Sequence, residues 1–138
     1  TGEGTDFGSV EVIGGSATQT YTIQNTGTGV LNLGSDSVTV SGTGFALEGS
    51  QPATTVAAGA SVSFQVKFDP SASGAATGSV SIANDDPDEA PYNFDISGTG
   101  LIPEMNVQGG TPATDIVDGD ASPSTGEGTD FGSDEFNV

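Results

Sequence analysis

The chain of 138 residues is long enough to bury one hydrophobic core and too short for two complete domains. Its formal net charge is −18, with a single Lys or Arg and no His. This charge excludes a nucleic acid or an anionic membrane surface as a partner, because both are bound through Lys and Arg side chains. The absence of Cys and His removes thiol nucleophiles and the commonest general base. We therefore expect a protein that is not an enzyme.

One stretch of nine residues, Thr-Gly-Glu-Gly-Thr-Asp-Phe-Gly-Ser, occurs at residues 1–9 and again, unchanged, at residues 125–133. A spacing of this size matches a whole domain and not a small solenoid unit. The embedded aromatic residue argues against the chance recurrence of a Gly- and Thr-rich linker. The sequence therefore predicts one period of a repeating surface protein, followed by the opening of the next.

Alternation of apolar and polar residues predicts short β-strands along residues 1–100. The clearest strand is residues 61–68, where Val62, Phe64, Val66 and Phe68 share one face. Gly, Asn, Asp and Pro residues separate the strands, and no window of a dozen residues has helical spacing. In chain order, the predicted strands are residues 10–13, 17–25, 30–33, 37–41, 61–68, 78–83 and 92–96, with short pieces around residues 45–47 and 55–56.

Strands of this length and spacing are typical of an all-β fold, an Ig-like antiparallel β-sandwich of seven to eight strands over residues 1–100. The chain has no Cys and no Trp, so this core must consist of Phe, Tyr and aliphatic side chains. The predicted core residues are Tyr21, Ile23, Leu31, Val38, Val40, Phe64, Val66, Phe68, Val80, Ile82, Phe94 and Ile96.

Residues 101–138 differ from the rest of the chain. Residues 103–108 could add one strand, but the acidic stretch that follows has too little apolar content to fold alone. This composition predicts an extended acidic arm or linker that begins the next repeat. Residues 5–9 should occupy the only position for their strand in their own sandwich. The arm, which carries the second copy of the stretch, should therefore pack along an open edge of another molecule and build a head-to-tail fibre. The predicted anchors are Met105, Val107, Phe131 and Phe136.

Two acidic segments are candidate calcium sites, because calcium takes roughly six to eight oxygen ligands. The alternative for the loop at residues 84–89 is a solvated hairpin tip. The second segment departs from the EF-hand pattern, since Pro123 stands where that loop needs Gly. The candidate ligands are Asp85, Asp86, Asp88 and Glu89 in the first segment, and Asp115, Asp118, Asp120 and Asp130 in the second.

Several segments carry a resemblance to a known family: residues 64–70, residues 81–89, and the closing Gly98-Thr99-Gly100. On these residues the chain resembles the hydin-type Ig-like domains and, more narrowly, the bacterial "choice-of-anchor D" surface proteins. Residues 103–107 resemble the start of such a repeat. The resemblance implies an extracellular or cell-surface location and a role as a spacer, stalk or adhesive array. In the frame of that family, the chain enters one repeat late and its last forty residues begin another.

The sequence thus predicts an extracellular structural module that assembles with other copies of itself, stabilised by calcium. The alternative is an adhesin domain that binds a glycan or a host-surface ligand. A glycosidase or a sugar-binding module needs exposed aromatic rings along a cleft. The chain has no Trp, and Tyr21 and Tyr92 both fall on the inward phase of their strands. No apolar run is long enough to span a bilayer.

Overall fold

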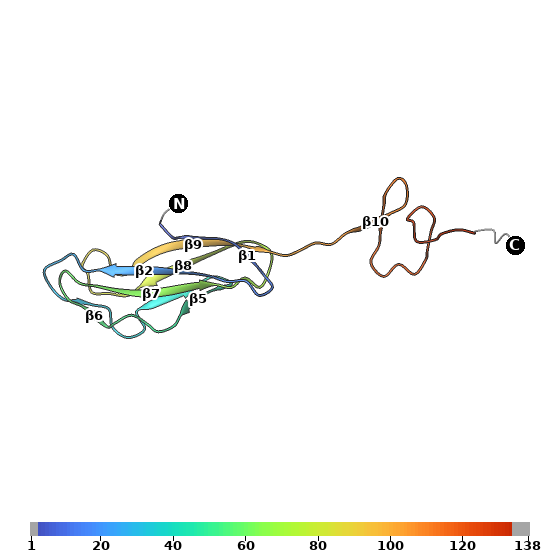
Figure 1. Ribbon diagram of the computed structural model, residues 1–138. Coiled ribbons are helices and arrows are strands. Elements are labelled where there is room, and N and C mark those ends of the chain that lie inside the picture. Colours follow the sequence, from blue (N-terminus) through green and yellow to red (C-terminus); the bar gives the residue numbers. More distant parts are fainter. Residues whose placement is uncertain (1–2, 134–138) are drawn as a thin grey trace. The chain divides into compact units, whose positions relative to one another are not determined.

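The computed structural model describes residues 3–133, which form strands and turns (Figure 1). The chain divides into two compact units, Thr1–Ile102 and Pro103–Val138. In the described part of the chain, no helix could cross a membrane.

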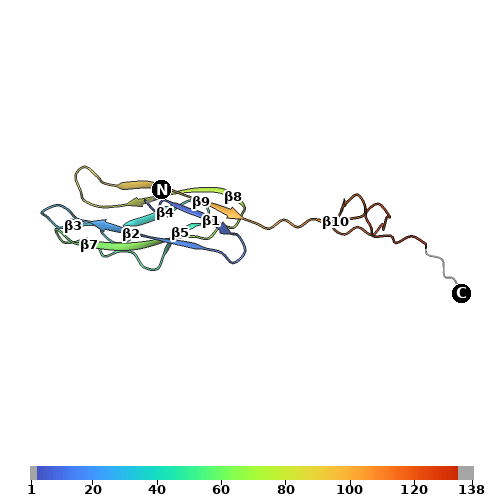
Figure 2. The same cartoon turned by 45° about the horizontal axis from the view of Figure 1, so that its top comes forward.

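The first unit is a sandwich of two main sheets (Figures 1 and 2). One sheet has the strand order β1-β9-β8-β4, with bounds β1 (Asp6–Glu11), β9 (Tyr92–Leu101), β8 (Gly74–Ile82) and β4 (Val38–Ser41). The facing sheet has the order β2-β7-β5, with bounds β2 (Ala17–Gln24), β7 (Ser61–Phe68) and β5 (Phe45–Glu48). A short pair joins β3 (Leu31–Asn32) to β6 (Thr55–Val56). This architecture confirms the predicted all-β Ig-like sandwich.

Strand β1 differs from the other paired strands of the sandwich in two ways. It runs parallel to β9, whereas the other pairs are antiparallel. Its two buried residues, Phe7 and Val10, are three positions apart, because the register shifts between Asp6 and Ser9. Gly8 lies in this bulge with φ +73°, a conformation that glycine adopts without steric cost. The sequence analysis gave residues 5–9 a strand position but left Phe7 and Val10 out of the core, since a bulged strand does not alternate.

The core between the two sheets contains every residue that the sequence assigned to it, either buried or packed against the buried cluster. Its centre is an aromatic cluster in which the ring centroids of Phe45 and Phe68 lie 4.5 Å apart. Phe7 packs edge-on against both rings, at 5.4 Å from Phe45 and 6.2 Å from Phe68. The buried core residues that the sequence analysis missed are Phe7, Val10, Leu33, Phe45 and Val56.

The second unit is built around an antiparallel hairpin of β10 (Val107–Gly109) and β11 (Thr114–Ile116). The backbone of Gly109 packs so closely on the carbonyl oxygen of Glu127 that a Cβ atom would collide with it. The Ser124 carbonyl accepts hydrogen bonds from the backbone N–H groups of Thr129 (3.1 Å) and Asp130 (3.0 Å). We expected a single strand and no further fold here. Glycine-to-backbone contacts and turn hydrogen bonds hold this unit together, where the sequence analysis looked only for apolar content.

Candidate functional site

The two copies of the nine-residue stretch share one turn, at Asp6–Gly8 and at Asp130–Gly132. Gly8 and its equivalent Gly132 have φ values of +73° and +71°. Asp6 Oδ1 accepts a hydrogen bond from Gly8 N at 2.9 Å, and Asp130 Oδ1 accepts the equivalent bond from Gly132 N at 2.8 Å. The second copy therefore keeps the turn that shapes β1, although its surroundings are different.

The aromatic residue of the stretch is buried in one copy and exposed in the other. Phe7 is 6% exposed within the aromatic cluster, whereas Phe131 is 94% exposed. Burying a Phe side chain is worth about 1.5–3 kcal/mol relative to leaving it in water. The second copy thus presents the same turn, with an aromatic group that is not buried among the described residues.

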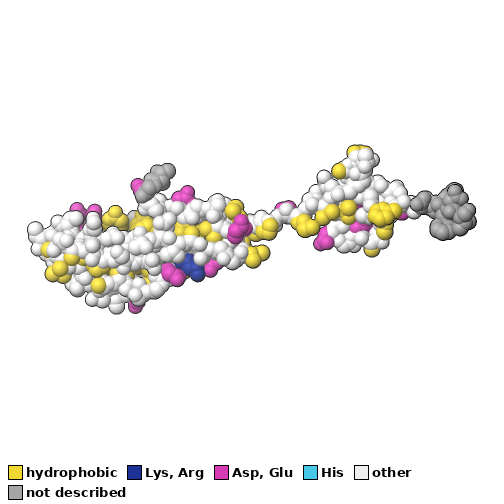
Figure 3. Space-filling view, viewed as in Figure 1, with side chains coloured by type: hydrophobic (Ala, Val, Ile, Leu, Met, Phe, Trp, Pro, Cys, Tyr) yellow, Lys and Arg dark blue, Asp and Glu magenta, His cyan; other side chains and the backbone are white. Residues whose placement is uncertain are grey.

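The other predicted assembly residues are also exposed, with Met105 at 82% and Val107 at 44%. On the face of the second unit seen in Figure 3, apolar side chains follow one another. Phe136 lies outside the described residues. The three described anchors are therefore accessible to another molecule.

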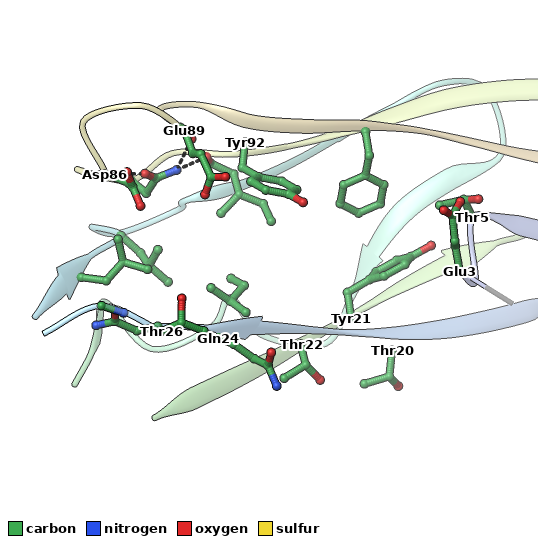
Figure 4. Close-up of a pocket in the computed structure, with 18 residues that line it drawn as sticks. Glu3, Thr5, Thr20, Tyr21, Thr22, Gln24, Thr26, Asp86, Glu89 and Tyr92 are labelled. Carbon is green, nitrogen blue, oxygen red and sulfur yellow. Dashed lines mark hydrogen bonds between the residues drawn. The ribbon is translucent and has the colours of Figure 1, made fainter. Parts of the chain in front are cut away.

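A cleft of about 740 Å³ lies between the two sheets of the sandwich. One wall comes from β2 and the other from the first half of β9. Figure 4 shows Tyr21 and Tyr92 pointing into the cleft from opposite walls, with Glu3 and Thr5 at one end. Asp86 and Glu89 lie at the other end. The sequence analysis did not foresee this cleft, because it depends on how far apart the two sheet edges lie.

The two tyrosines differ in their surroundings. Tyr21 is half-buried, its hydroxyl donates a hydrogen bond to the Gly4 carbonyl at 2.6 Å, and burial raises its pKa. The Tyr21 ring packs on Phe94 at 5.0 Å between centroids. Tyr92 was expected to point into the core, but it is 49% exposed and lines the cleft. The prediction failed because β9 is an open edge at its beginning, so that its inward face is not fully covered there.

The acidic loop at residues 84–89 is held by its own hydrogen bonds. The two carboxylate oxygens of Asp85 accept hydrogen bonds from Asn32 N (2.8 Å) and Asn32 Nδ2 (2.7 Å). These bonds from the Asn32 side chain and backbone lower the pKa of Asp85. Asp86 lies beside Asp88, and a hydrogen bond with the Asp86 carboxylate together with its negative charge raises the pKa of Asp88. The Glu89 backbone carbonyl accepts a hydrogen bond from Asn84 Nδ2 at 3.0 Å.

The second acidic segment uses its carboxylates in a similar way. Asp115 accepts hydrogen bonds from Asn106 Nδ2 (3.0 Å) and Gln108 Nε2 (2.6 Å), and these two bonds lower its pKa. Asp120 Oδ1 accepts the backbone N–H of Ser122 at 2.8 Å. Over residues 3–133, the structure brings no three of the predicted ligands, Asp118 and Asp130 included, into an arrangement that could hold a metal ion. Calcium binding therefore stays a prediction that rests on the charge of the chain.

The family of the sandwich follows from comparison with known proteins. The family described as HYDIN/CFA65/VesB-like, Ig-like domain matches residues 2–99. The chain belongs to this family. The match confirms the hydin-type resemblance, whereas the narrower likeness to "choice-of-anchor D" proteins stays a prediction.

Two solved structures share the fold of this Ig-like domain. The secreted serine protease VesC from Vibrio cholerae is 20% identical with a TM-score of 0.53, over 70% of this chain and 21% of VesC. The ASH/PapD-like domain 7 of human CEP192 is 12% identical with a TM-score of 0.50, over 74% of this chain and 84% of that domain. At these identities the likeness shows the fold alone. This chain spans about a fifth of VesC, and a search among curated proteins finds no match.

The bonds of Asp85 predict how acid affects the stability of this Ig-like domain. Because the folded-state pKa of Asp85 is lowered, its contribution is complete above the ordinary Asp pKa of about 3.9 and is lost as the pH falls through the lowered value. Asp85→Ala should therefore melt at a lower temperature than the parent chain at pH 7, and the difference should shrink in thermal melts below about pH 3.

Asp88→Asn in the same loop is the matched control. The pKa of Asp88 is raised, so its ionised form is disfavoured in the folded chain, and removing its charge should cause no loss of stability at pH 7. Equal losses for the two variants would contradict the assignment.

Proposed function

We propose that this Ig-like domain is an extracellular structural module of a bacterial cell surface. It would join to other copies head-to-tail and so build a stalk, fibril or filament, either by strand exchange between chains or by tandem repetition in one polypeptide. The observation that carries the proposal is the second copy of the nine-residue stretch, which keeps the turn found at Gly8 in β1 and exposes Phe131.

The contacts that β1 makes in its own sandwich indicate which contacts the second copy of the stretch could make with the sandwich of another molecule. In β1, Ser9 and Val10 pair with Thr99 and Gly100 of β9, and Phe7 enters the aromatic cluster. In the second copy, Ser133 would take the place of Ser9 in this backbone pairing, and Phe131 would supply the same anchor to a second sandwich. Because the donor and acceptor surfaces differ, the contact does not close on itself and propagates as a fibre.

Two further observations support the location and the form of the contact. VesC, which shares the fold, is a secreted protein. After Ser133 the two copies diverge, so that the position of the buried Val10 is taken by Asp134 in the second copy. A buried carboxylate without a partner is unfavourable. Strand exchange should therefore rest on residues 129–133.

Deletion of residues 1–9 tests this proposal, because it leaves the β1 position to residues 125–133 of another chain. We expect the shortened chain to form oligomers in size-exclusion chromatography with light scattering. An excess of the synthetic nonapeptide Thr-Gly-Glu-Gly-Thr-Asp-Phe-Gly-Ser should convert these oligomers to monomers. Phe131→Asp in the shortened chain should prevent assembly.

A shortened chain that binds the nonapeptide and still remains a monomer would contradict the proposal. If the shortened chain does not fold, circular dichroism with and without the nonapeptide decides. If the nonapeptide restores folding but a higher concentration of the shortened chain does not, strand exchange between chains is contradicted. Folding that the peptide fails to restore counts against it as well, because β1 is then not replaceable.

A glycan-binding adhesin is the second candidate, and the half-exposed ring of Tyr92 in the cleft favours it. Sugars stack on exposed aromatic rings in a cleft of this kind. This alternative predicts that the monomer binds members of a glycan array and that Tyr92→Ala loses the binding. It would replace the structural proposal if the chain bound a glycan and did not assemble.

We also propose that calcium stabilises the protein, on the ground of its net charge of −18. An ion present at a hundred times its dissociation constant would add about 2.7 kcal/mol to the free energy of unfolding. The expected result is a higher melting temperature in millimolar calcium chloride than after treatment with a chelator. Sodium chloride at matched ionic strength is the control, and an equal effect of sodium would show that general screening is enough.

A further inference from the structure

The cleft between the sheets is bordered by two open strand edges. β2 is hydrogen-bonded only to β7 among the described strands. Among the described residues, β1 pairs with β9 only from Ser97 onwards, so that none of them covers the edge of the first half of β9 on that side. Unpaired strand edges attract further strands. The cleft is therefore a place where the sandwich can take up one more extended segment.

The floor of the cleft is apolar and incompletely covered. Tyr21, Ile23, Leu31 and Phe94 line the cleft and are only partly buried, although they pack on the core. Proteins cover such edges with a further segment or with charged residues. At the level of these four side chains the sandwich is open to solvent.

The repeat places one particular segment at this cleft. Glu3 and Thr5 of the first copy line the cleft, and their equivalents in the second copy are Glu127 and Thr129. In the second unit, the hairpin packs directly on this part of the stretch: Gly109 lies against the Glu127 carbonyl, and Gly110 lies against Gly128.

The two copies can be compared because their conformations match at this point. Gly4 has φ +73° and its equivalent Gly128 has φ +75°. Where the second copy forms the first strand of a sandwich and keeps its packing on the hairpin, the hairpin lies at the mouth of that sandwich's cleft, beside Gln19 and Tyr21, which are the neighbours of Gly4. The hairpin also has apolar groups to place there, since Met105, Val107 and Val117 are exposed.

We infer that residues 103–124 of one copy of this chain, built around the β10–β11 hairpin, cover the cleft between β2 and β9 of the next sandwich. The contact rests on the proposed function and deepens it, because it names the surface on which the second unit docks. It also assigns the two halves of the second unit different tasks. The hairpin covers the cleft, and residues 125–133 supply the strand.

The contact needs only modest affinity. A segment that is tethered to the strand beside its docking site has an effective concentration in the millimolar range. As a free peptide, the hairpin segment should accordingly bind weakly, at concentrations from about 0.1 to 1 mM. NMR spectroscopy detects binding of this strength residue by residue.

A synthetic peptide of residues 103–133 that carries Phe131→Asp tests the inference when it is titrated into the isotope-labelled full chain, because it keeps the residues on which the hairpin packs. We expect saturable shift changes at the residues that line the cleft, above all Tyr21, Ile23 and Phe94. A peptide with Val107→Asp should lose these changes, and because the change is in the peptide, the fold of the labelled chain is not at risk. A peptide with Thr111→Ser, at the hairpin turn, is the matched control that should still bind.

Shift changes confined to the labelled chain's own hairpin, or none at 2 mM peptide, would overturn the inference. So would a glycan that perturbs the cleft residues where the peptide does not. The peptide carries Phe131→Asp and so lacks the anchor of the strand, which makes its binding independent of strand exchange. Binding at the cleft without assembly of the chain lacking residues 1–9 would retain the docking surface and reject the head-to-tail joint. Assembly of that chain without binding of the peptide at the cleft would retain the head-to-tail joint and reject the docking surface.

Discussion

Phe7→Ala is expected to lower the free energy of unfolding by about 3–5 kcal/mol, whereas Phe131→Ala should change it by less than about 0.5 kcal/mol. Both residues have the same eight neighbours in the nine-residue stretch, so local sequence cannot account for a difference. Phe7 is 6% exposed between Phe45 and Phe68, and Phe131 is 94% exposed. Replacing Phe7 by Ala leaves a cavity in the core. Replacing Phe131 by Ala only shortens a side chain that is already exposed to solvent.

Chemical denaturation of the two variants beside the parent chain measures this difference, provided that all three remain monomers. The midpoint should fall for Phe7→Ala and stay unchanged for Phe131→Ala. Equal losses would mean that the second copy is buried in the isolated chain and is not available to a neighbour. A loss below about 1 kcal/mol for Phe7→Ala would place β1 outside the folding core.

Gly98→Ala is expected to destabilise the sandwich by about 1–3 kcal/mol through overpacking. A Cβ atom on Gly98 would lie 2.5 Å from the ring of Phe68, which is fully buried. The ring also stacks on Phe45 and packs against Phe7. It cannot move aside without disturbing the whole aromatic cluster.

Gly29→Ala is the matched control for this prediction. A Cβ atom there would meet nothing within 4 Å, and the backbone of Gly29 is outside the conformations that favour glycine. We expect a change within about 0.5 kcal/mol in the same denaturation experiment. If Gly98→Ala were equally neutral, β9 would be free to shift away from the core, and the close packing of the two sheets at Phe68 would be refuted.

The sequence alone determined the main strands and most of the core. Strict alternation identifies β2 and β7, where residues 17–24 pair with residues 61–68 without a break. The same alternation placed Phe64, Val66, Val80 and Ile96 inside, and the structure buries all four. Alternation succeeds here because a regular strand turns every second side chain to the same face.

Only the tertiary structure decided the features on which the proposed function rests. The bulge at Gly8 gives β1 a spacing of three between Phe7 and Val10, which alternation cannot detect. Phe45 gains its burial from rings supplied by β1 and β7, and the cleft exists because β9 is left uncovered at Tyr92. The sequence repeat alone identifies Phe131 as the equivalent of Phe7 in the second copy. Burial depends on which surfaces meet in space, so identical sequence and identical turn geometry left one ring in the core and the other in solvent.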